Sequence, residues 1–221
     1  MRMRLKKHLD ERMDKVSSLV LFIENECFLK KSFEEKKNIF DFSEVFGNDN
    51  PVCIEIGCGK GKFVNEIACR YPDINFIAVE RLTNVIVTAV EKTESLGLKN
   101  VRYLNVSAEN LPCFIPEKSI KRIYLNFSCP YPKNTYANRR LTNKRFLGVY
   151  ESLLMSGGDI YQKTDNKNFF AYSLEQYSLA GYKLKNVTLD LTQSEEENVV
   201  TEYEQKFIEK NMPIYKLEAY K

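Results

Sequence analysis

The segment 52–61, Val-Cys-Ile-Glu-Ile-Gly-Cys-Gly-Lys-Gly, constrains the fold of this chain more than any other feature. Its first five residues, apolar except for Glu55, predict a buried strand, and a helical stretch begins at Lys62. Between them stand Gly57, Gly59 and Gly61. Glycine has no Cβ, so the backbone can turn sharply and a ligand can lie against the bare main chain. Strand, glycine-rich turn and helix in this order indicate an α/β nucleotide-binding domain, with its ligand at the carboxyl end of the strand.

The sequence after Pro51 alternates between strand and helix patterns, which is typical of a parallel sheet. The expected strands are 52–56, 74–80, 101–105, 120–127 and 158–163, and the expected helices are 61–70, 83–96, 141–154 and 166–180. Gly157, Gly158 and Gly181 are predicted to stop helices. Beyond them, 183–190 and 213–220 predict a terminal antiparallel strand pair, with 199–208 helical or irregular. We therefore expect an α/β fold with a doubly wound, mostly parallel, seven-stranded Rossmann-like sheet and an antiparallel last strand.

A chain of 221 residues is long enough for one such domain and a terminal extension. We expect residues 1–46 to be a helical, basic N-terminal extension and residues 47–221 to be the domain. No apolar run reaches about 18 residues and the N-terminus has no secretory signal, so we expect a cytoplasmic protein without a membrane contact. Six scattered cysteines without a C-x-x-C pair, and one histidine, favour reduced thiols and no metal site.

Positive charge is concentrated in two places, although the net charge is only +3. Residues 1–12 and residues 133–145 hold these clusters, and the second contains no acidic residue. The basic residues are Arg2, Arg4, Lys6, Lys7 and Arg12 in the first cluster, and Lys133, Arg139, Arg140, Lys144 and Arg145 in the second. Such patches on a nearly neutral protein suggest a localised contact with a polyanion.

The spacing of the glycines discriminates between cofactors. A dinucleotide fingerprint is G-x-G-x-x-G, whereas here the third glycine comes one residue early and Glu55 stands two residues before the first. This pattern resembles the first motif of S-adenosylmethionine-dependent methyltransferases and disfavours a nicotinamide-dependent oxidoreductase. Glu80 ends the second strand, where an acid can accept hydrogen bonds from ribose hydroxyls. Asn105, Ser107 and Glu109 remain alternatives for reading the adenine edge.

The end of the fourth strand carries the features that suggest a nucleic-acid base as substrate. The strand runs into Ser-Cys-Pro-Tyr-Pro-Lys at 128–133. Two prolines flanking Tyr131 make a stiff loop beside the cofactor end of the sheet. Tyr131 can stack on a base, and Lys133 can meet a phosphate or a base edge.

Several segments together resemble the tRNA (guanine-N7-)-methyltransferase family, in order and spacing, over nearly the whole chain. They are Glu-Ile-Gly-Cys-Gly-Lys-Gly at 55–61, Val-Glu at 79–80, Asn-Phe-Ser-Cys-Pro-Tyr-Pro-Lys at 126–133, Asn-Arg-Arg-Leu-Thr at 138–142, Lys-Thr-Asp-Asn at 163–166 and Thr-Glu-Tyr-Glu at 201–204. The resemblance implies S-adenosylmethionine as cofactor, S-adenosylhomocysteine as product, and tRNA as partner. The implied and candidate cofactor-binding residues are Glu55, Gly57, Gly59, Gly61, Glu80, Ser107 and Cys129. Those for the substrate are Tyr131, Lys133, Arg139, Arg140, Asp165, Thr201, Glu202, Tyr203 and Glu204.

The chain departs from the family pattern at the reaction end. The family usually has Asp-Pro-Trp-Pro where this chain has Cys-Pro-Tyr-Pro at 129–132, and its acid after the third strand is replaced by Ser107. Guanine N7 has a free lone pair, so the reaction needs alignment and a negative field more than a general base. The candidate catalytic residues are Cys129, Asp165 and Glu204. We expect Cys129 to weaken the chemistry without abolishing it, because the two acids can supply the field.

Two other functions stay open on the sequence. One is an amino-group methyltransferase acting on a nucleic-acid base, although the spacing between Asn126 and Pro130 breaks its Asn-Pro-Pro-Tyr motif. The other is a catalytically weakened relative that binds RNA. The sequence is compatible with a monomer and with a homodimer.

Overall fold

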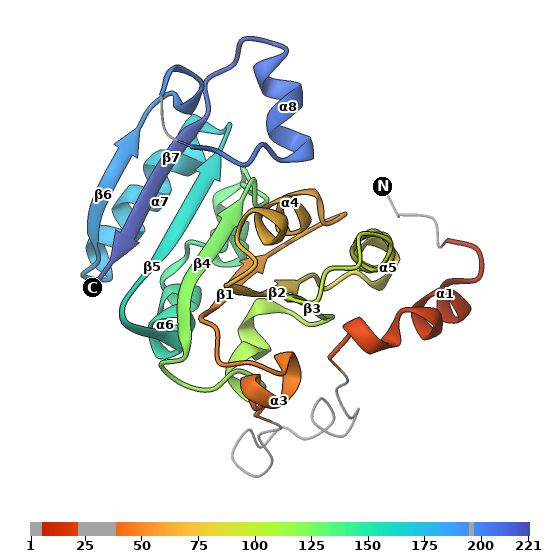
Figure 1. Cartoon of the computed structure of the whole chain (residues 1–221). Helices are drawn as coiled ribbons and strands as arrows, with labels where there is room; N and C mark the ends of the chain where they lie inside the picture. Colours follow the sequence, from red (N-terminus) through yellow and green to blue (C-terminus); the bar gives the residue numbers. More distant parts are fainter. Residues whose placement is uncertain (1–5, 22–38, 195–196) are drawn as a thin grey trace.

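The computed structural model describes residues 6–21, 39–194 and 197–221. These residues form a seven-stranded sheet with helices around it (Figure 1). The strand order is β3-β2-β1-β4-β5-β7-β6. The strands are β1 Val52–Ile56, β2 Asn75–Val79, β3 Val101–Leu104, β4 Ile120–Asn126, β5 Leu154–Thr164, β6 Lys183–Thr188 and β7 Tyr215–Tyr220. β1 to β5 pair in parallel, whereas β7 runs antiparallel to both β5 and β6. This topology confirms the expected fold class.

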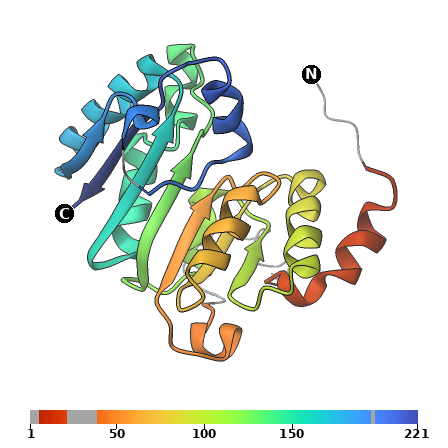
Figure 2. The ribbon, with the colours of Figure 1, turned by 45° about the horizontal axis from the view of Figure 1, so that its top comes forward.

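Helices cover both faces of the sheet, α4 and α5 on one side and α6 and α7 on the other (Figures 1 and 2). The α-helices are α1 Leu9–Lys15, α3 Phe42–Phe46, α4 Lys62–Arg70, α5 Thr83–Ser95, α6 Lys144–Leu153, α7 Lys167–Leu179 and α8 Glu202–Ile208. Short 3-10 helices are η1 Ser17–Leu19, η2 Ala108–Cys113, η3 Asn134–Arg139 and η4 Leu191–Gln193. Side chains alternate along β1, so Ile54 joins the core under α6 and Cys53 joins the core under α4. Glu55 therefore faces the α4 side.

One sequence prediction about helix ends was wrong. Gly157 and Gly158 lie inside β5, and α6 already ends at Leu153, because Leu154 has an extended backbone. A Cβ at Gly158 would lie 3.0 Å from the carbonyl oxygen of Ile120. Glycine is needed here because the start of β5 approaches β4 closely. Gly181 behaves as predicted, with φ of 76° just after α7.

The described part of the N-terminal extension docks on the domain through α1. Arg12 donates two hydrogen bonds to the Glu91 carboxylate on α5, at 2.7 and 2.6 Å, so one predicted basic residue serves an internal contact. Arg2, Arg4 and Cys27, and the helix prediction over 22–38, lie outside the described residues. The division of the chain at residues 46 and 47 stays a prediction.

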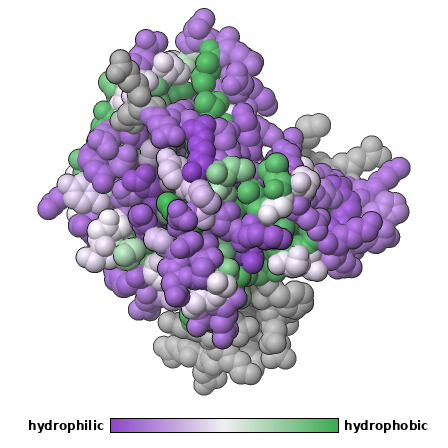
Figure 3. Space-filling view, viewed as in Figure 1, coloured by the Kyte–Doolittle hydropathy of each residue, from purple (hydrophilic) through white to green (hydrophobic). Residues whose placement is uncertain are grey.

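The surface on the α4 side is mostly hydrophilic, with apolar residues in small separate groups (Figure 3). Among the helices of the described residues, none has both the length and the apolar character needed to cross a bilayer.

Candidate active site

The turn between β1 and α4 leaves room for a ligand at two of its three glycines. Gly57 and Cys58 both donate their backbone N–H groups to the Val79 carbonyl, at 2.8 and 3.1 Å, which ties the turn to β2. Gly57 and Gly59 have left-handed φ values of 82° and 57°, and a Cβ at either would meet nothing within 4 Å. Gly61 serves packing instead, since its Cβ would lie 2.8 Å from the Ala89 Cβ on α5.

A buried carboxylate lies at the end of β1. Glu55 is 3% exposed, and its Oε1 accepts a hydrogen bond of 3.0 Å from Asn126 Nδ2 on β4. Among the described residues, Glu55 Oε2 and Asn126 Oδ1 have no hydrogen-bond partner although both are buried. Burial raises the pKa of Glu55 to about 7, while the Asn126 hydrogen bond and the Lys163 charge act in the opposite direction. Two buried acceptors without a partner favour a ligand that donates hydrogen bonds, and an ammonium group is such a donor.

Glu80 stands at the next strand end, where the sequence predicted it. Its Oε1 accepts a hydrogen bond from the Leu82 backbone at 3.0 Å, and its carbonyl accepts one from Asn105 Nδ2 at 2.7 Å. The Asn105 Oδ1 accepts from Thr83 at 2.7 Å, so Asn105 serves the β2–α5 turn. Of the three residues predicted as alternatives for reading the adenine edge, Ser107 and Glu109 line the neighbouring cavity.

This cavity, of about 620 Å³, extends from the carboxyl ends of β1 and β2 to the loop that follows β4. It brings together six of the predicted site residues, namely Gly57, Glu80, Ser107, Cys129, Tyr131 and Arg139. Phe127, Leu141 and Phe146 add apolar surface, and Arg81 and Arg145 add positive charge. A mixed apolar and polar cavity at the carboxyl edge of a doubly wound sheet is a typical small-molecule site.

The loop after β4 is held by a buried arginine. Phe127 and Tyr131 both have left-handed backbones, with φ of 50° and 40°, which costs energy in residues with a Cβ. Arg140 is 7% exposed and donates to the carbonyls of Pro130 and Tyr131, at 3.0 and 2.9 Å. Its guanidinium also lies 4.3 Å from the centre of the Tyr172 ring. Arg140 therefore fixes the loop.

Its neighbours in the basic cluster are exposed. Arg139 lines the cavity and its guanidinium lies 4.9 Å from the centre of the Tyr136 ring. Lys133 is exposed just before η3. These two cations, unlike Arg140, can reach a phosphate in solution.

The segment 201–204 points its side chains in different directions. Thr201 and Glu204 form a capping box at the start of α8, and Glu204 is 1% exposed, with its Oε2 2.6 Å from Lys163 Nζ. Glu202 pairs with Lys92 on α5 at 3.1 Å, whereas Tyr203 is 60% exposed. Asp165 is half-buried just beyond β5.

Comparison with known proteins gives a consistent family. The family model described as "Putative methyltransferase" matches residues 49–217. A tRNA (guanine-N(7)-)-methyltransferase from Brevibacillus brevis is 43% identical and aligns over 90% of this chain and 89% of its own length. One from Bacillus subtilis is 47% identical over 80% of this chain and 84% of its own. The chain belongs to the tRNA (guanine-N7-)-methyltransferase family.

Solved structures share the fold of this methyltransferase at low sequence identity. A 16S rRNA methyltransferase, KamB, has a TM-score of 0.61 and 16% identity, over 85% of this chain and 95% of its own. A SAM-dependent methyltransferase from Aquifex aeolicus has a TM-score of 0.57 and 13% identity, over 97% and 98%. These structures show the fold alone, whereas the family model and the relatives at 43% and 47% identity confirm the family resemblance found in the sequence.

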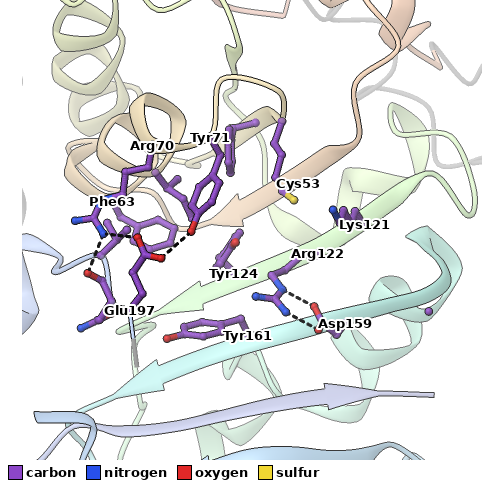
Figure 4. Close-up of a pocket in the computed structure, with 16 residues that line it drawn as sticks. Cys53, Phe63, Arg70, Tyr71, Lys121, Arg122, Tyr124, Asp159, Tyr161 and Glu197 are labelled. Atoms are coloured by element: carbon purple, nitrogen blue, oxygen red, sulfur yellow. Dashed lines mark hydrogen bonds and ion pairs between the residues drawn. The ribbon is translucent and has the colours of Figure 1, made fainter. Parts of the chain in front are cut away.

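A second cavity of the methyltransferase, of about 360 Å³, lies on the α4 side of the sheet (Figure 4). Arg122 donates to both Asp159 oxygens at 2.6 and 2.7 Å, and its guanidinium lies over the Tyr161 ring. Glu197 accepts from Arg70 at 3.4 Å at the opposite wall. Because its main charges are paired with one another, this cavity offers less chemistry than the cavity that holds Gly57 and Glu80.

The sequence predicted no site role for two buried polar residues close to Glu55, namely Asn126 and Lys163. Asn126 is the last residue of β4 and Lys163 is the penultimate residue of β5, and the two are register partners at the carboxyl edge. A polar residue that ends a buried strand was the available signal, because burying it requires a partner.

Proposed function

We propose that this chain transfers the methyl group of S-adenosylmethionine to N7 of a guanine in tRNA. The observation that carries the proposal is the cavity in which Gly57 and Glu80, at the cofactor end, meet Tyr131 and Arg139, at the base end. The names of the relatives at 43–50% identity supply the target base.

The residues present fit this cofactor. Glu55 Oε2 and Asn126 Oδ1 are buried acceptors that lack partners within the described part of the chain, which suits the α-ammonium of its methionine part. Gly57 and Gly59 leave open space beside their α-carbons, and Glu80 keeps one carboxylate oxygen for ribose hydroxyls. When bound, the cofactor supplies an electrophilic methyl group on a sulfonium.

The chain contributes alignment more than proton transfer. Guanine N7 carries its lone pair in the ring plane, so Tyr131 stacking on the ring would aim it at the methyl group. Positive charge grows on the purine during transfer, and a nearby carboxylate stabilises it. Asp165 is our candidate for that carboxylate, since Cys129 stands where the family has an acid. Lys133 and Arg139 would hold the RNA backbone.

The direct test incubates the purified chain with methyl-labelled S-adenosylmethionine and unmodified tRNA, followed by nuclease digestion. Label in 7-methylguanosine supports the proposal. Label in N6-methyladenosine would instead support an amino-group methyltransferase. tRNA binding without any labelled nucleoside would support a weakened RNA-binding relative.

A double variant, Lys133→Ala with Arg139→Ala, tests the assignment of the two ends. We expect tRNA affinity to fall and its dependence on salt to weaken, by about 0.9 or less in log–log slope per cation removed. Calorimetry should give an unchanged affinity for S-adenosylhomocysteine. An equal loss of both affinities would contradict the separation of a cofactor end from an RNA end.

A further inference from the structure

Lys163 is a fully buried cation at the carboxyl end of β5. Its Nζ donates to Glu204 Oε2 at 2.6 Å, to the Val199 carbonyl at 2.9 Å and to Asn198 Oδ1 at 3.0 Å. An ammonium has three N–H groups, so these contacts use its full donor capacity. The Phe63 ring closes the remaining side, with its centre 5.5 Å from Nζ. The ammonium is thus satisfied within the chain, and it holds three residues of one segment.

The Glu204 carboxylate is equally committed. Its Oε2 accepts from Lys163 and, at 3.2 Å, from the Thr201 backbone, while its Oε1 accepts from Asn198 Nδ2 at 2.6 Å. At 1% exposure it presents no surface to a nucleotide. A guanine could reach this carboxylate only after these bonds were broken, which would strand the buried Lys163.

Lys163 also joins the segment to the wall of the cavity. Its carbonyl accepts a hydrogen bond of 2.9 Å from the Phe127 backbone N–H. The Phe127 ring lines the cavity and stacks on Phe207 of α8, with centres 6.1 Å apart and planes at 7°. Phe127 has a left-handed backbone, and such a conformation persists only when its surroundings hold it. Phe127 is therefore held at two points, by the Lys163 carbonyl of β5 and by Phe207 of segment 197–208, and Figure 1 shows α8 near the upper ends of β4 and β5.

We propose that Lys163 and Glu204 are positioning residues: their buried pair holds segment 197–208 against Phe127 and so shapes the base end of the cavity. Glu204 acts through Lys163 and does not touch the guanine. The proposal rests on the proposed function for its kinetic readout. It replaces the sequence-based hypothesis that Glu204 supplies a field directly at the base.

The experiment is a double-mutant cycle with Lys163→Met and Glu204→Gln. Glu204→Gln removes the charge and keeps one oxygen that can accept from Lys163 and from the Thr201 backbone, while its NH2 group replaces the oxygen that accepts from Asn198. Each single variant leaves one buried charge without its partner, whereas the double variant leaves none. The matched control removes a surface pair with the same Nζ–Oε distance of 2.6 Å, Lys221 and Glu151, by Lys221→Met with Glu151→Gln.

Three quantities are measured for each variant: amide hydrogen exchange over residues 197–208, the affinity for S-adenosylhomocysteine, and kcat and KM for tRNA methylation. Each single variant should speed exchange in the segment and lower kcat by about tenfold or more, with cofactor affinity within about twofold. The double variant should recover protection and a kcat within about threefold of the original chain. The control should match the original chain throughout.

A different pattern would overturn the proposal. If Glu204→Gln and the double variant lost kcat equally while the segment stayed protected, Glu204 would act on the base itself. Should the single variants fail to fold, the double variant alone decides by the same two readings, since it carries no unpaired charge. An original chain that methylates no tRNA refutes the proposed function, and hydrogen exchange then still decides whether the pair holds the segment.

Discussion

The buried carboxylate of Glu55 should make the stability of this protein fall between pH 5 and pH 8. The ordinary pKa of 4.5 rises to about 7 in the folded chain, mainly because of burial. A carboxyl whose pKa is raised by folding binds more protons in the folded state than in the unfolded one. Stability from this group is therefore present at low pH and is lost as the pH rises from 4.5 towards 7.

The magnitude follows from the two pKa values. The full shift corresponds to about 3 kcal/mol, at about 1.4 kcal/mol per unit. Because Glu55 is already partly ionised at pH 5 in the unfolded chain, the loss between pH 5 and pH 8 is about 2.5 kcal/mol. The Glu55→Gln variant keeps the acceptor for Asn126 but carries no charge, so it should lack this contribution.

Urea unfolding of both proteins at pH 5, 6, 7 and 8 isolates the effect, because every other titrating group cancels in the difference. Between pH 5 and pH 8, the difference in free energy of unfolding between Glu55→Gln and the original chain should shift by about 2.5 kcal/mol in favour of the variant. A difference that stays constant within about 0.5 kcal/mol would refute the raised pKa. At pH 7, S-adenosylhomocysteine should release protons from the original chain on binding, measured by calorimetry in two buffers, and bind Glu55→Gln more weakly.

Other predictions concern the glycine turn and the base-end loop. Gly61→Ala should lower the free energy of unfolding by about 2–5 kcal/mol, because a left-handed backbone and a 2.8 Å approach to the Ala89 Cβ add together. Gly47→Ala, with φ of 70° and open space, should cost only about 1–2 kcal/mol in the same urea titration. Arg140→Ala should reduce kcat for tRNA methylation at least about tenfold at every salt concentration. Arg139→Ala should instead raise the KM for tRNA in a salt-dependent way. Identical effects of the two substitutions would mean that Arg140 does not hold the loop in place. Cys129→Asp should raise the methylation rate about tenfold, whereas Cys129→Ser should leave the rate within about twofold of the original chain. A Cys129→Ser variant without activity would instead indicate a direct role of the thiol.

Much of the fold could be predicted because its signals are local. The apolar run of β1, the glycine turn and the start of α4 at Lys62 depend on neighbouring residues only, and they lie where the sequence placed them. The same holds for Glu80, since a strand that ends in an acid brings that acid to the carboxyl edge of a parallel sheet. Gly158 could not be assigned this way, because its need for glycine comes from the approach of Ile120.

The roles of similar residues within the site were decided by tertiary structure. Arg139 and Arg140 are adjacent and chemically identical, yet only Arg140 is buried against Tyr172 and the loop carbonyls. Tyr203 and Glu204 likewise diverge, one to solvent and the other to Lys163, which lies 41 residues earlier in the chain. Sequence pattern by itself determined which residues gather at the carboxyl edge of the sheet. It could not determine which of these residues pair with one another, because the role of a buried charge depends on its partner in space, and that partner comes from a distant strand.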